Sequence, residues 1–197
     1  MEVIDLKVIS NNKQYYSIKE LKNMGYTYYA INNLIRNGIL QRLNRFTFEN
    51  MFFCGVENDF FTANAYVPEG VICLMSAARY YDLTSFLPDS VTVAIERKKK
   101  VSTLPDWPDI NVYYFNQTRM DTGVVQVHDG DNVFRIFDIE KTVIDIICYR
   151  NKIGIEETAE VIRNYLKRSD RQLDRLYAYS QKLKCEKILR TYLEVLL

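Results

Sequence analysis

The sequence predicts an α+β protein, because helical and alternating hydrophobic patterns occupy separate parts of the chain. Apolar residues recur at helical spacing over residues 18–38, and again from Asp138 to the C-terminus. Between Val91 and Ile136 the apolar residues instead alternate with polar ones, which is typical of strands that bury one face. Strands grouped in one part of a chain and helices in others favour the α+β class.

Two short helices are predicted near the N-terminus from their end signals. Ser17 and Glu20 have the spacing of a capping box, and Gly25 stands where a helix would end. Thr27 is a second N-cap residue, and the helix that it begins would end at Gly38. Two helices joined by a tight glycine turn indicate a helix-turn-helix, whose second helix enters the major groove of DNA.

The second helix has an apolar stripe and a polar face. The stripe consists of Ala30, Ile31, Leu34 and Ile35. Asparagine and arginine side chains on the other face have the chemistry that reads base edges. We therefore expect DNA contacts from the residues of this helix that lie outside the stripe, namely Thr27, Tyr28, Tyr29, Asn32, Asn33 and Arg36.

A β-hairpin is predicted directly after these helices. Residues 39–43 and 46–48 would form its strands, and Asn44 and Arg45 its turn. A basic hairpin in this position is typical of the wing of a winged helix-turn-helix. The residues expected to contact DNA from it are Gln41, Arg42, Asn44 and Arg45.

Positive charge is concentrated in this N-terminal part. Between Leu6 and Phe48 there are seven Lys or Arg residues and one acidic residue, whereas the whole chain has a net charge of +1. Concentrated positive charge favours contact with DNA phosphates. An alternative stays open, because small basic helix-turn-helix units also serve as modules that bind acidic proteins.

The chain of 197 residues is long enough for two domains, which we place at residues 1–50 and 51–197. Residues 2–10 are expected to form an opening helix that packs on the helix-turn-helix. The N-terminus lacks a secretory signal and no stretch approaches eighteen apolar residues, so we expect a cytoplasmic protein with no membrane contact.

The second domain is expected to contain a small, mostly antiparallel sheet and several helices. The predicted strands are residues 91–96, 111–115, 124–127 and 133–136, with a hairpin turn at Gly130 between the last two. Residues 71–74 form a buried run between two short helices, at 59–66 and 76–81. Helices then continue from Asp138, with breaks near Gly154, Ser169 and Lys184. Their apolar stripes include Leu173, Leu176 and Tyr177.

The residue types that enzymes use are sparse and scattered. His128 is the only histidine, and it is expected on the surface beside a turn. The cysteines are widely spaced, which favours buried, reduced thiols over disulfides or a zinc site; they are Cys54, Cys73, Cys148 and Cys185. Asp89 and Glu96 match the letters of a nuclease motif but belong to one strand, about 23 Å apart, too far to share a metal ion. We expect no catalysis, no metal and no cofactor.

Two further basic stretches would form a second nucleic-acid surface or lie simply in solvent. One is the run of residues 97–100, and the other extends from Arg163 to Arg190, with nine basic and three acidic residues. The candidate residues are Arg97, Lys98, Lys99, Lys100, Arg163, Lys167, Arg168, Arg171 and Arg175.

Three stretches of the chain resemble the AbiEi-like antitoxins of bacterial abortive-infection, type IV toxin–antitoxin systems. They are the helix-turn-helix with its hairpin, notably residues 17–21 and 34–42; the run VICLMSAA at residues 71–78, which leads to Asp82-Leu83-Thr84; and DIEKTVID at residues 138–145. Together they span about residues 14–150, and their order and spacing fit the family. Many members of this family have Ser-His where Cys73 and Leu74 stand, so any role of that histidine is absent here.

The resemblance implies a transcriptional autorepressor and antitoxin. The N-terminal domain would bind inverted repeats in the double-stranded DNA of its own promoter, where two copies would pair. The C-terminal domain would counter a nucleotidyltransferase-like toxin without a stable complex. The alternatives are a stand-alone winged-helix transcriptional regulator, and an enzyme or modifier that acts on nucleic acid through the C-terminal domain.

Overall fold

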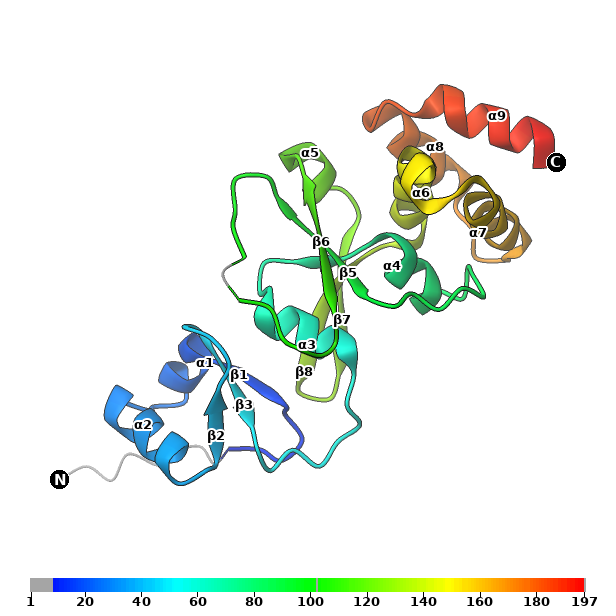
Figure 1. Ribbon diagram of the computed structural model, residues 1–197. Helices are drawn as coiled ribbons and strands as arrows, with labels where there is room; N and C mark the ends of the chain where they lie inside the picture. Colours follow the sequence, from blue (N-terminus) through cyan, green and yellow to red (C-terminus); the bar gives the residue numbers. More distant parts are fainter. Residues whose placement is uncertain (1–8, 102, 197) are drawn as a thin grey trace.

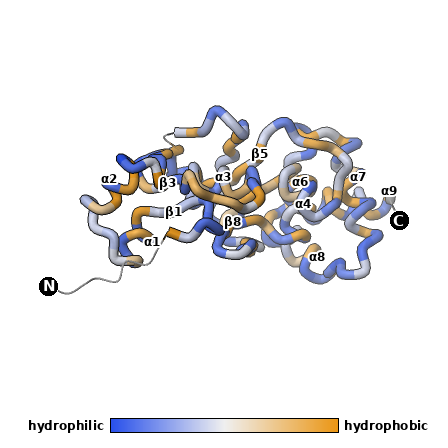
Figure 2. The backbone as a smooth tube through the Cα atoms, turned by 90° about the horizontal axis from the view of Figure 1, so that it is seen from below, coloured by the Kyte–Doolittle hydropathy of each residue, from blue (hydrophilic) through white to orange (hydrophobic). Residues whose placement is uncertain are grey.

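A computed structural model describes residues 9–101 and 103–196, and its fold is α+β. The molecule is elongated (Figure 1). The N-terminal elements lie at one end, a sheet lies in the middle, and the last helices lie at the other end. The same order is seen from below in Figure 2, where β5 and β8 lie between the N-terminal elements and helices α4, α6 and α7.

The N-terminal elements form a unit with its own hydrophobic core. Its elements are β1 (Tyr15–Ser17), α1 (Ile18–Asn23), α2 (Tyr28–Arg36), β2 (Leu40–Arg42) and β3 (Thr47–Asn50). The three strands form an antiparallel sheet in the order β1-β3-β2. Leu21 from α1 and Ile31 from α2 pack with Phe48 from β3, and each is at most 1% exposed. This core fixes the two helices against the sheet.

The end signals of both N-terminal helices are confirmed. The Ser17 hydroxyl accepts a hydrogen bond from the backbone N–H of Glu20, at 3.1 Å, and the Glu20 carboxylate accepts one from the N–H of Ser17, at 2.7 Å. Thr27 caps α2 by accepting from the N–H of Ala30, at 3.2 Å. Gly25 has a φ of 93°, which a residue with a side chain rarely adopts, so α1 ends there.

The hairpin is confirmed, but the strand that completes its sheet was not predicted. Strand β1 pairs with β3, placing Tyr16 opposite Phe48. A strand of three residues is too short to show the alternation of apolar and polar residues that predicts a strand. β1 is therefore recognised only from its pairing with β3. The predicted opening helix falls mostly outside the described residues. Ile9 is described, is not helical, and packs against the N-terminal core.

The central sheet has five strands in the order β6-β5-β4-β8-β7. They are β4 (Val71–Ile72), β5 (Val91–Glu96), β6 (Ile110–Phe115), β7 (Val124–Asp129) and β8 (Asn132–Phe137). The prediction of a mostly antiparallel sheet is confirmed only in part. The pairs β7–β8 and β4–β5 are antiparallel, but the sheet is mixed, since β5 pairs with β6 in parallel and β4 with β8 in parallel. The connection over residues 97–109 is long enough for a crossover, which parallel pairing requires. The short buried run at residues 71–72 proves to be the central strand.

Helices cover both faces of this sheet. Helix α3 (Asp59–Tyr66) packs on one face, where its Phe61 contacts the core that contains Val93 and Phe134. On the other face α4 (Leu74–Tyr80) and α6 (Ile139–Ile153) bury a second core around Ala94 and Phe137. Alternate residues of β5 therefore pack into the two cores on opposite faces of the sheet, as the period-two pattern predicts.

The C-terminal helices pack around α6. They are α7 (Ile155–Lys167), α8 (Leu173–Lys182) and α9 (Glu186–Leu196), and the short α5 (Gln117–Met120) lies between β6 and β7. The predicted breaks near Gly154, Ser169 and Lys184 are confirmed. The predicted stripe of α8 is wrong in part, because Leu176 is buried whereas Leu173 is 48% and Tyr177 42% exposed. Only one side of this helix meets α6, which leaves the flanking positions in solvent.

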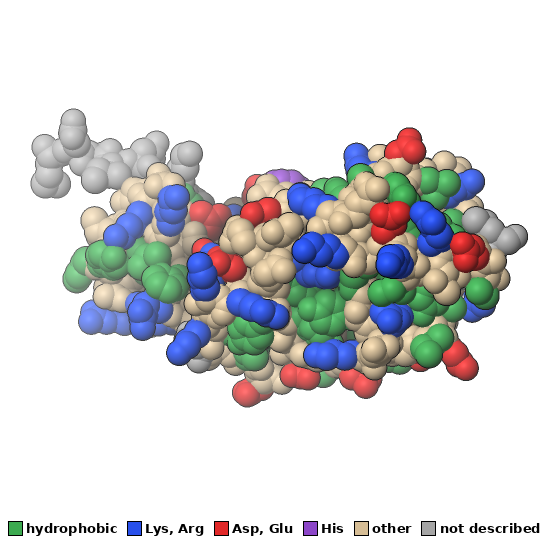
Figure 3. Space-filling view, turned by 90° about the horizontal axis from the view of Figure 1, so that it is seen from above, with side chains coloured by type: hydrophobic (Ala, Val, Ile, Leu, Met, Phe, Trp, Pro, Cys, Tyr) green, Lys and Arg blue, Asp and Glu red, His purple; other side chains and the backbone are tan. Residues whose placement is uncertain are grey.

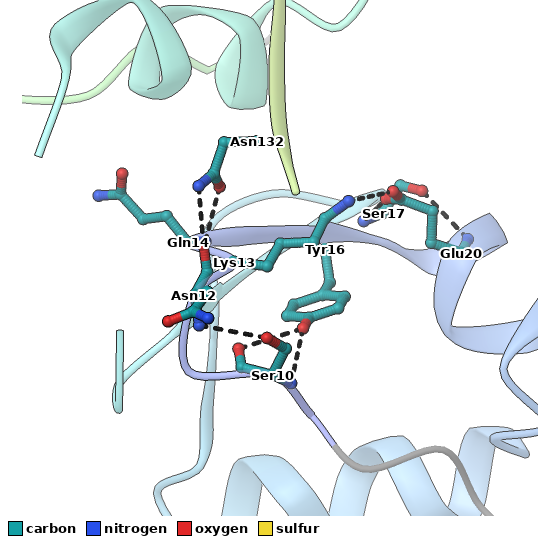
Figure 4. A network of polar contacts seen from close by, with 8 residues as sticks. All are labelled: Ser10, Asn12, Lys13, Gln14, Tyr16, Ser17, Glu20 and Asn132. Atoms are coloured by element: carbon teal, nitrogen blue, oxygen red, sulfur yellow. Dashed lines mark hydrogen bonds and ion pairs between the residues drawn. The ribbon is translucent and has the colours of Figure 1, made fainter. Parts of the chain in front are cut away.

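A polar seam joins the N-terminal unit to the sheet (Figure 4). The amide oxygen of Asn132, at the start of β8, accepts a hydrogen bond from the N–H of Gln14 at 2.8 Å, and its nitrogen donates to the carbonyl of Asn12 at 2.9 Å. The Tyr15 hydroxyl also hydrogen-bonds Thr62 on α3, at 2.9 Å. These contacts hold the N-terminal unit to the sheet and to α3.

Candidate nucleic-acid interface

Helix α2 presents a polar and aromatic face to solvent. Its apolar stripe faces the N-terminal core, with Ile31 buried and the other members half-buried. Tyr28 and Tyr29 are 59% and 74% exposed. Asn32 and Arg36 are exposed as well, whereas Asn33 is half-buried. Large aromatic side chains are costly to expose, so two adjacent exposed tyrosines mark a surface suited to binding.

Lys22 of α1 was missed by sequence reasoning and belongs to this surface. Its ammonium donates a hydrogen bond to the Tyr28 hydroxyl at 2.8 Å and lies 4.0 Å from the centre of the Tyr28 ring. The contact orders an exposed ring at the start of α2 and places a positive charge beside it. The two residues are six apart across the turn, a spacing that neither helix pattern indicates.

The hairpin carries two exposed arginines at its tip. Arg42 lies over the Phe48 ring at 5.2 Å, and Arg45 lies over the Phe46 ring at 5.7 Å. Phe46 is 56% exposed, so Arg45 and its aromatic partner both face solvent. Gln41 is exposed on the same strand as Arg42. The hairpin can therefore offer positive charge and hydrogen-bond donors to a polyanion.

Asn44 shapes the hairpin from within. Its amide oxygen accepts from the backbone N–H groups of Phe46 and Thr47, at 2.8 and 3.0 Å. Its amide nitrogen donates to the carbonyl of Ala65 on α3, at 3.2 Å. Asn44 was expected to contact DNA, but these bonds make it a residue that positions the hairpin. Thr27 is likewise used as a helix cap.

The basic run after β5 lies beside the hairpin. A cleft of about 610 Å³ is lined by Arg45 and Phe46 on one side and by Lys99 and Lys100 on the other. Lys99 forms an ion pair with Glu69 at 2.7 Å, and Arg97, Lys98 and Lys100 are exposed. Charges that are more than fifty residues apart in sequence thus line one cleft. Figure 3 shows Lys and Arg side chains spread from the N-terminal elements across the middle of one face.

The basic residues of the C-terminal helices do not join this surface. Helices α7 and α8 lie at the opposite end of the molecule from α2 (Figure 1). Arg168 is held by Asp170, at 2.8 and 2.9 Å, and by the carbonyl of Tyr81. Arg171 donates to the carbonyl of Arg168, and Arg175 lies 3.9 Å from the buried Glu140. Arg163 and Lys167 are exposed on α7. The predicted second surface is therefore two separate regions.

Glu20 is an acidic residue on α1, next to the candidate interface in sequence. Burial would raise its pKa, but hydrogen bonds from Lys13 and Ser17 lower the pKa below its ordinary value. Lys13 lies 2.6 Å from the Glu20 carboxylate. The carboxylate is thus committed to the capping box and to this ion pair, and its negative charge is balanced locally.

The remaining candidates for catalytic or metal-binding residues lie in separate parts of the fold. Asp89 lies just before β5 and Glu96 ends it, as predicted. His128 is exposed on β7, close to the hairpin turn. All four cysteines are free; Cys73 and Cys185 are buried, but Cys54 is exposed, contrary to prediction. Within residues 9–101 and 103–196, no group of three His, Cys, Asp or Glu residues is arranged to hold a metal ion.

No helix within the described part of the chain is long and apolar enough to cross a membrane. Comparison with protein-family models and with curated proteins gave no match for this chain.

Proposed function

We propose that this protein is a DNA-binding autorepressor and antitoxin. In this proposal the N-terminal unit is a winged helix-turn-helix, with α2 as the recognition helix and the β2–β3 hairpin as the wing. The observation that carries it is the exposed face of α2, where Tyr28, Tyr29, Asn32 and Arg36 stand together next to a hairpin bearing Arg42 and Arg45. The domain boundary between residues 50 and 51 is part of the proposal.

The base-reading contacts would come from α2, and the phosphate contacts from the basic hairpin. Asn32 and Arg36 have the donor and acceptor geometry for base edges in the major groove. Arg42 and Arg45 would contact phosphates or the minor groove, and the cleft beside Arg45 would extend this contact to Lys100. Two copies would bind the two halves of an inverted repeat.

The antitoxin role rests on the resemblance to the AbiEi-like family in the residues that were quoted for it. The C-terminal domain, residues 51–197, would counter a nucleotidyltransferase-like toxin without forming a stable complex with it. Growth of cells that express a nucleotidyltransferase-like toxin together with this protein tests this role. Rescue by full-length protein is the expected outcome, and toxicity that persists despite expression of the folded protein contradicts it.

Binding to the DNA upstream of its own coding sequence tests the first part of the proposal. Tight binding to that duplex, weaker binding to a scrambled duplex of equal length, and loss of affinity with added salt are expected. Equal, weak binding to both duplexes would indicate a protein-interaction module instead. The measurement is made at two salt concentrations, so that sequence preference and phosphate attraction are separated.

A further inference from the structure

Strand β7 forms one open edge of the central sheet. It is the last strand in the order β6-β5-β4-β8-β7, and it pairs with β8 on its inner side. Within residues 9–101 and 103–196, no strand pairs with its outer side. Val124 and Val125 are 37% and 38% exposed, and Gln126 and His128 are exposed as well. An uncovered edge offers a row of backbone donors and acceptors to another strand.

The pairing with β8 fixes which backbone groups of β7 face inward. Asp129 and Asn132 pair across a two-residue turn, and the closing pair of such a hairpin exchanges two hydrogen bonds. At the other end of the strand, the N–H of Asp138 donates to the carbonyl of Gly123 at 2.6 Å. Hydrogen-bonded pairs recur at every second residue of an antiparallel ladder. The odd-numbered residues of β7 therefore direct their backbone groups to β8.

The backbone N–H and C=O groups of the even-numbered residues, Val124, Gln126 and His128, point away from β8. A second copy of β7, running antiparallel along this edge, can bond all three only in one two-fold register. In that register Gln126 lies opposite Gln126 of the second copy, and Val124 lies opposite His128. Any other register leaves at least one of the three residues opposite a residue outside this set. The outer row of β7 is thus complementary to itself, as a two-fold interface requires.

The side chains suit the same register. Val125 lies opposite Val127 of the second copy, at the non-hydrogen-bonded positions where side chains approach most closely. Val127 already packs against the core that contains Phe134, so the pairing extends this apolar surface over the exposed Val125. Asp129, the acidic residue of β7, lies opposite Gly123, which has no side chain. No two like charges of the paired strands therefore meet.

Strand β7 lacks the features that usually protect an edge. Natural edge strands carry lysine or proline, or are bent by a bulge. The sequence of β7 is VVQVHD, and its register with β8 is unbroken from Val124 to Asp129. We propose that β7 is a dimerisation edge, along which two copies of this chain pair antiparallel about a two-fold axis at Gln126. The two five-stranded sheets then form one continuous sheet.

Sedimentation equilibrium of the full chain without DNA tests the dimer. The average mass should rise with protein concentration from 23.3 kDa towards twice that value. Gln126→Pro removes an outward N–H and spares the bonds to β8, so it should abolish the dimer. Val125→Lys buries a charge at the interface and should raise the dissociation constant at least about tenfold. Tyr114→Lys, at an exposed position on the opposite edge strand β6, is the matched control and should leave it unchanged.

A native chain that stays monomeric at every concentration overturns the proposal, and so does a dimer that survives both β7 variants. Urea unfolding of the variants shows whether each is folded. The measurement uses the protein alone, so its failure leaves the proposed DNA binding untouched, and failure of DNA binding leaves the dimer untouched.

Cross-linking tests the register and does not depend on a disruptive variant. Gln126→Cys, in a Cys54→Ser background that removes an exposed thiol, places two cysteines opposite each other across the axis. A short bis-maleimide should convert this protein into a covalent dimer. Asn111→Cys, exposed on β6, is the control and should give little product. Equal cross-linking of the two variants would show that the copies do not meet at Gln126.

Discussion

Individual side chains at the candidate interface divide into those that face solvent and those that hold the backbone. Tyr29 and Arg36 extend from α2 into solvent. Asn44 and Glu20 are also polar, but they hydrogen-bond the backbone. Asn44 does so in the hairpin and Glu20 at the start of α1. Residue type alone does not separate these roles, because an asparagine suits a base edge and a turn equally well.

Arg36→Ala should weaken binding to the specific DNA site by about 1–3 kcal/mol, because a base-edge contact of the recognition helix is lost. Titration of the upstream duplex, with a scrambled duplex beside it, measures the change. Arg163→Ala removes an equal charge at the other end of the molecule and should leave the affinity unchanged. Unaltered affinity and sequence preference in Arg36→Ala would show that α2 is not the recognition helix.

Glu20→Gln should change how stability depends on pH. Because the pKa of folded Glu20 is lowered from its ordinary value of 4.5, its carboxylate contributes stability above that pH, and the contribution is lost as the pH falls through the folded pKa. The side chain is 44% exposed, so we expect Glu20→Gln to lower the free energy of unfolding by only about 0.5 kcal/mol near pH 7 and by almost nothing near pH 3. Urea unfolding at both pH values measures it, with the exposed Glu194→Gln as control. An equal loss of unfolding free energy at both pH values would contradict a lowered pKa of Glu20 in the folded protein.

At the scale of elements, the seam between the N-terminal unit and β8 sets where the hairpin lies. Asn132 satisfies two backbone groups of the segment before β1, and Asn44 ties the hairpin turn to α3. Both contacts join parts of the chain that are remote in sequence. Asn44 itself lines the cleft that the hairpin shares with Lys100.

Asn132→Ala should destabilise the protein by about 2 kcal/mol, because the buried N–H of Gln14 loses its acceptor. Amide hydrogen exchange at Gln14 should accelerate at the same time. Asn111→Ala, an exposed asparagine on β6, is the matched control and should have little effect. Equal destabilisation by the two variants would mean that the hydrogen bonds of Asn132 contribute no more to stability than the exposed side chain of Asn111.

On the scale of the whole molecule, the distribution of charge decides which basic residues act together. The run at residues 97–100 meets the hairpin at a cleft, whereas Arg163 and Lys167 lie on α7 beyond the sheet. Net charge near zero conceals this difference, since phosphate attraction depends on the local arrangement of charges.

The double variant Lys98→Ala/Lys100→Ala should weaken DNA binding and reduce the slope of log affinity against log salt by about 2, if each lysine contacts one phosphate. Lys99 is left intact because it is paired with Glu69. Arg163→Ala/Lys167→Ala removes the same charge and should not alter the slope. Equal changes in both double variants would show that total charge, and not this surface, governs binding.

The local elements of this protein were determined by its sequence. The capping box of α1, the Thr27 cap, the stripe of α2 and the alternation of β5 are short-range patterns, and each appears in the structure where it was predicted. Short-range patterns report local hydrogen bonding and the face that an element buries, which neighbouring residues specify.

Only the tertiary structure decided how distant segments pair. It made residues 71–72 the central strand, set β5 parallel to β6, and brought Arg45 beside Lys100. Strand order and long-range contacts depend on which packing buries the most apolar surface while satisfying every polar group, and that is a property of the whole chain.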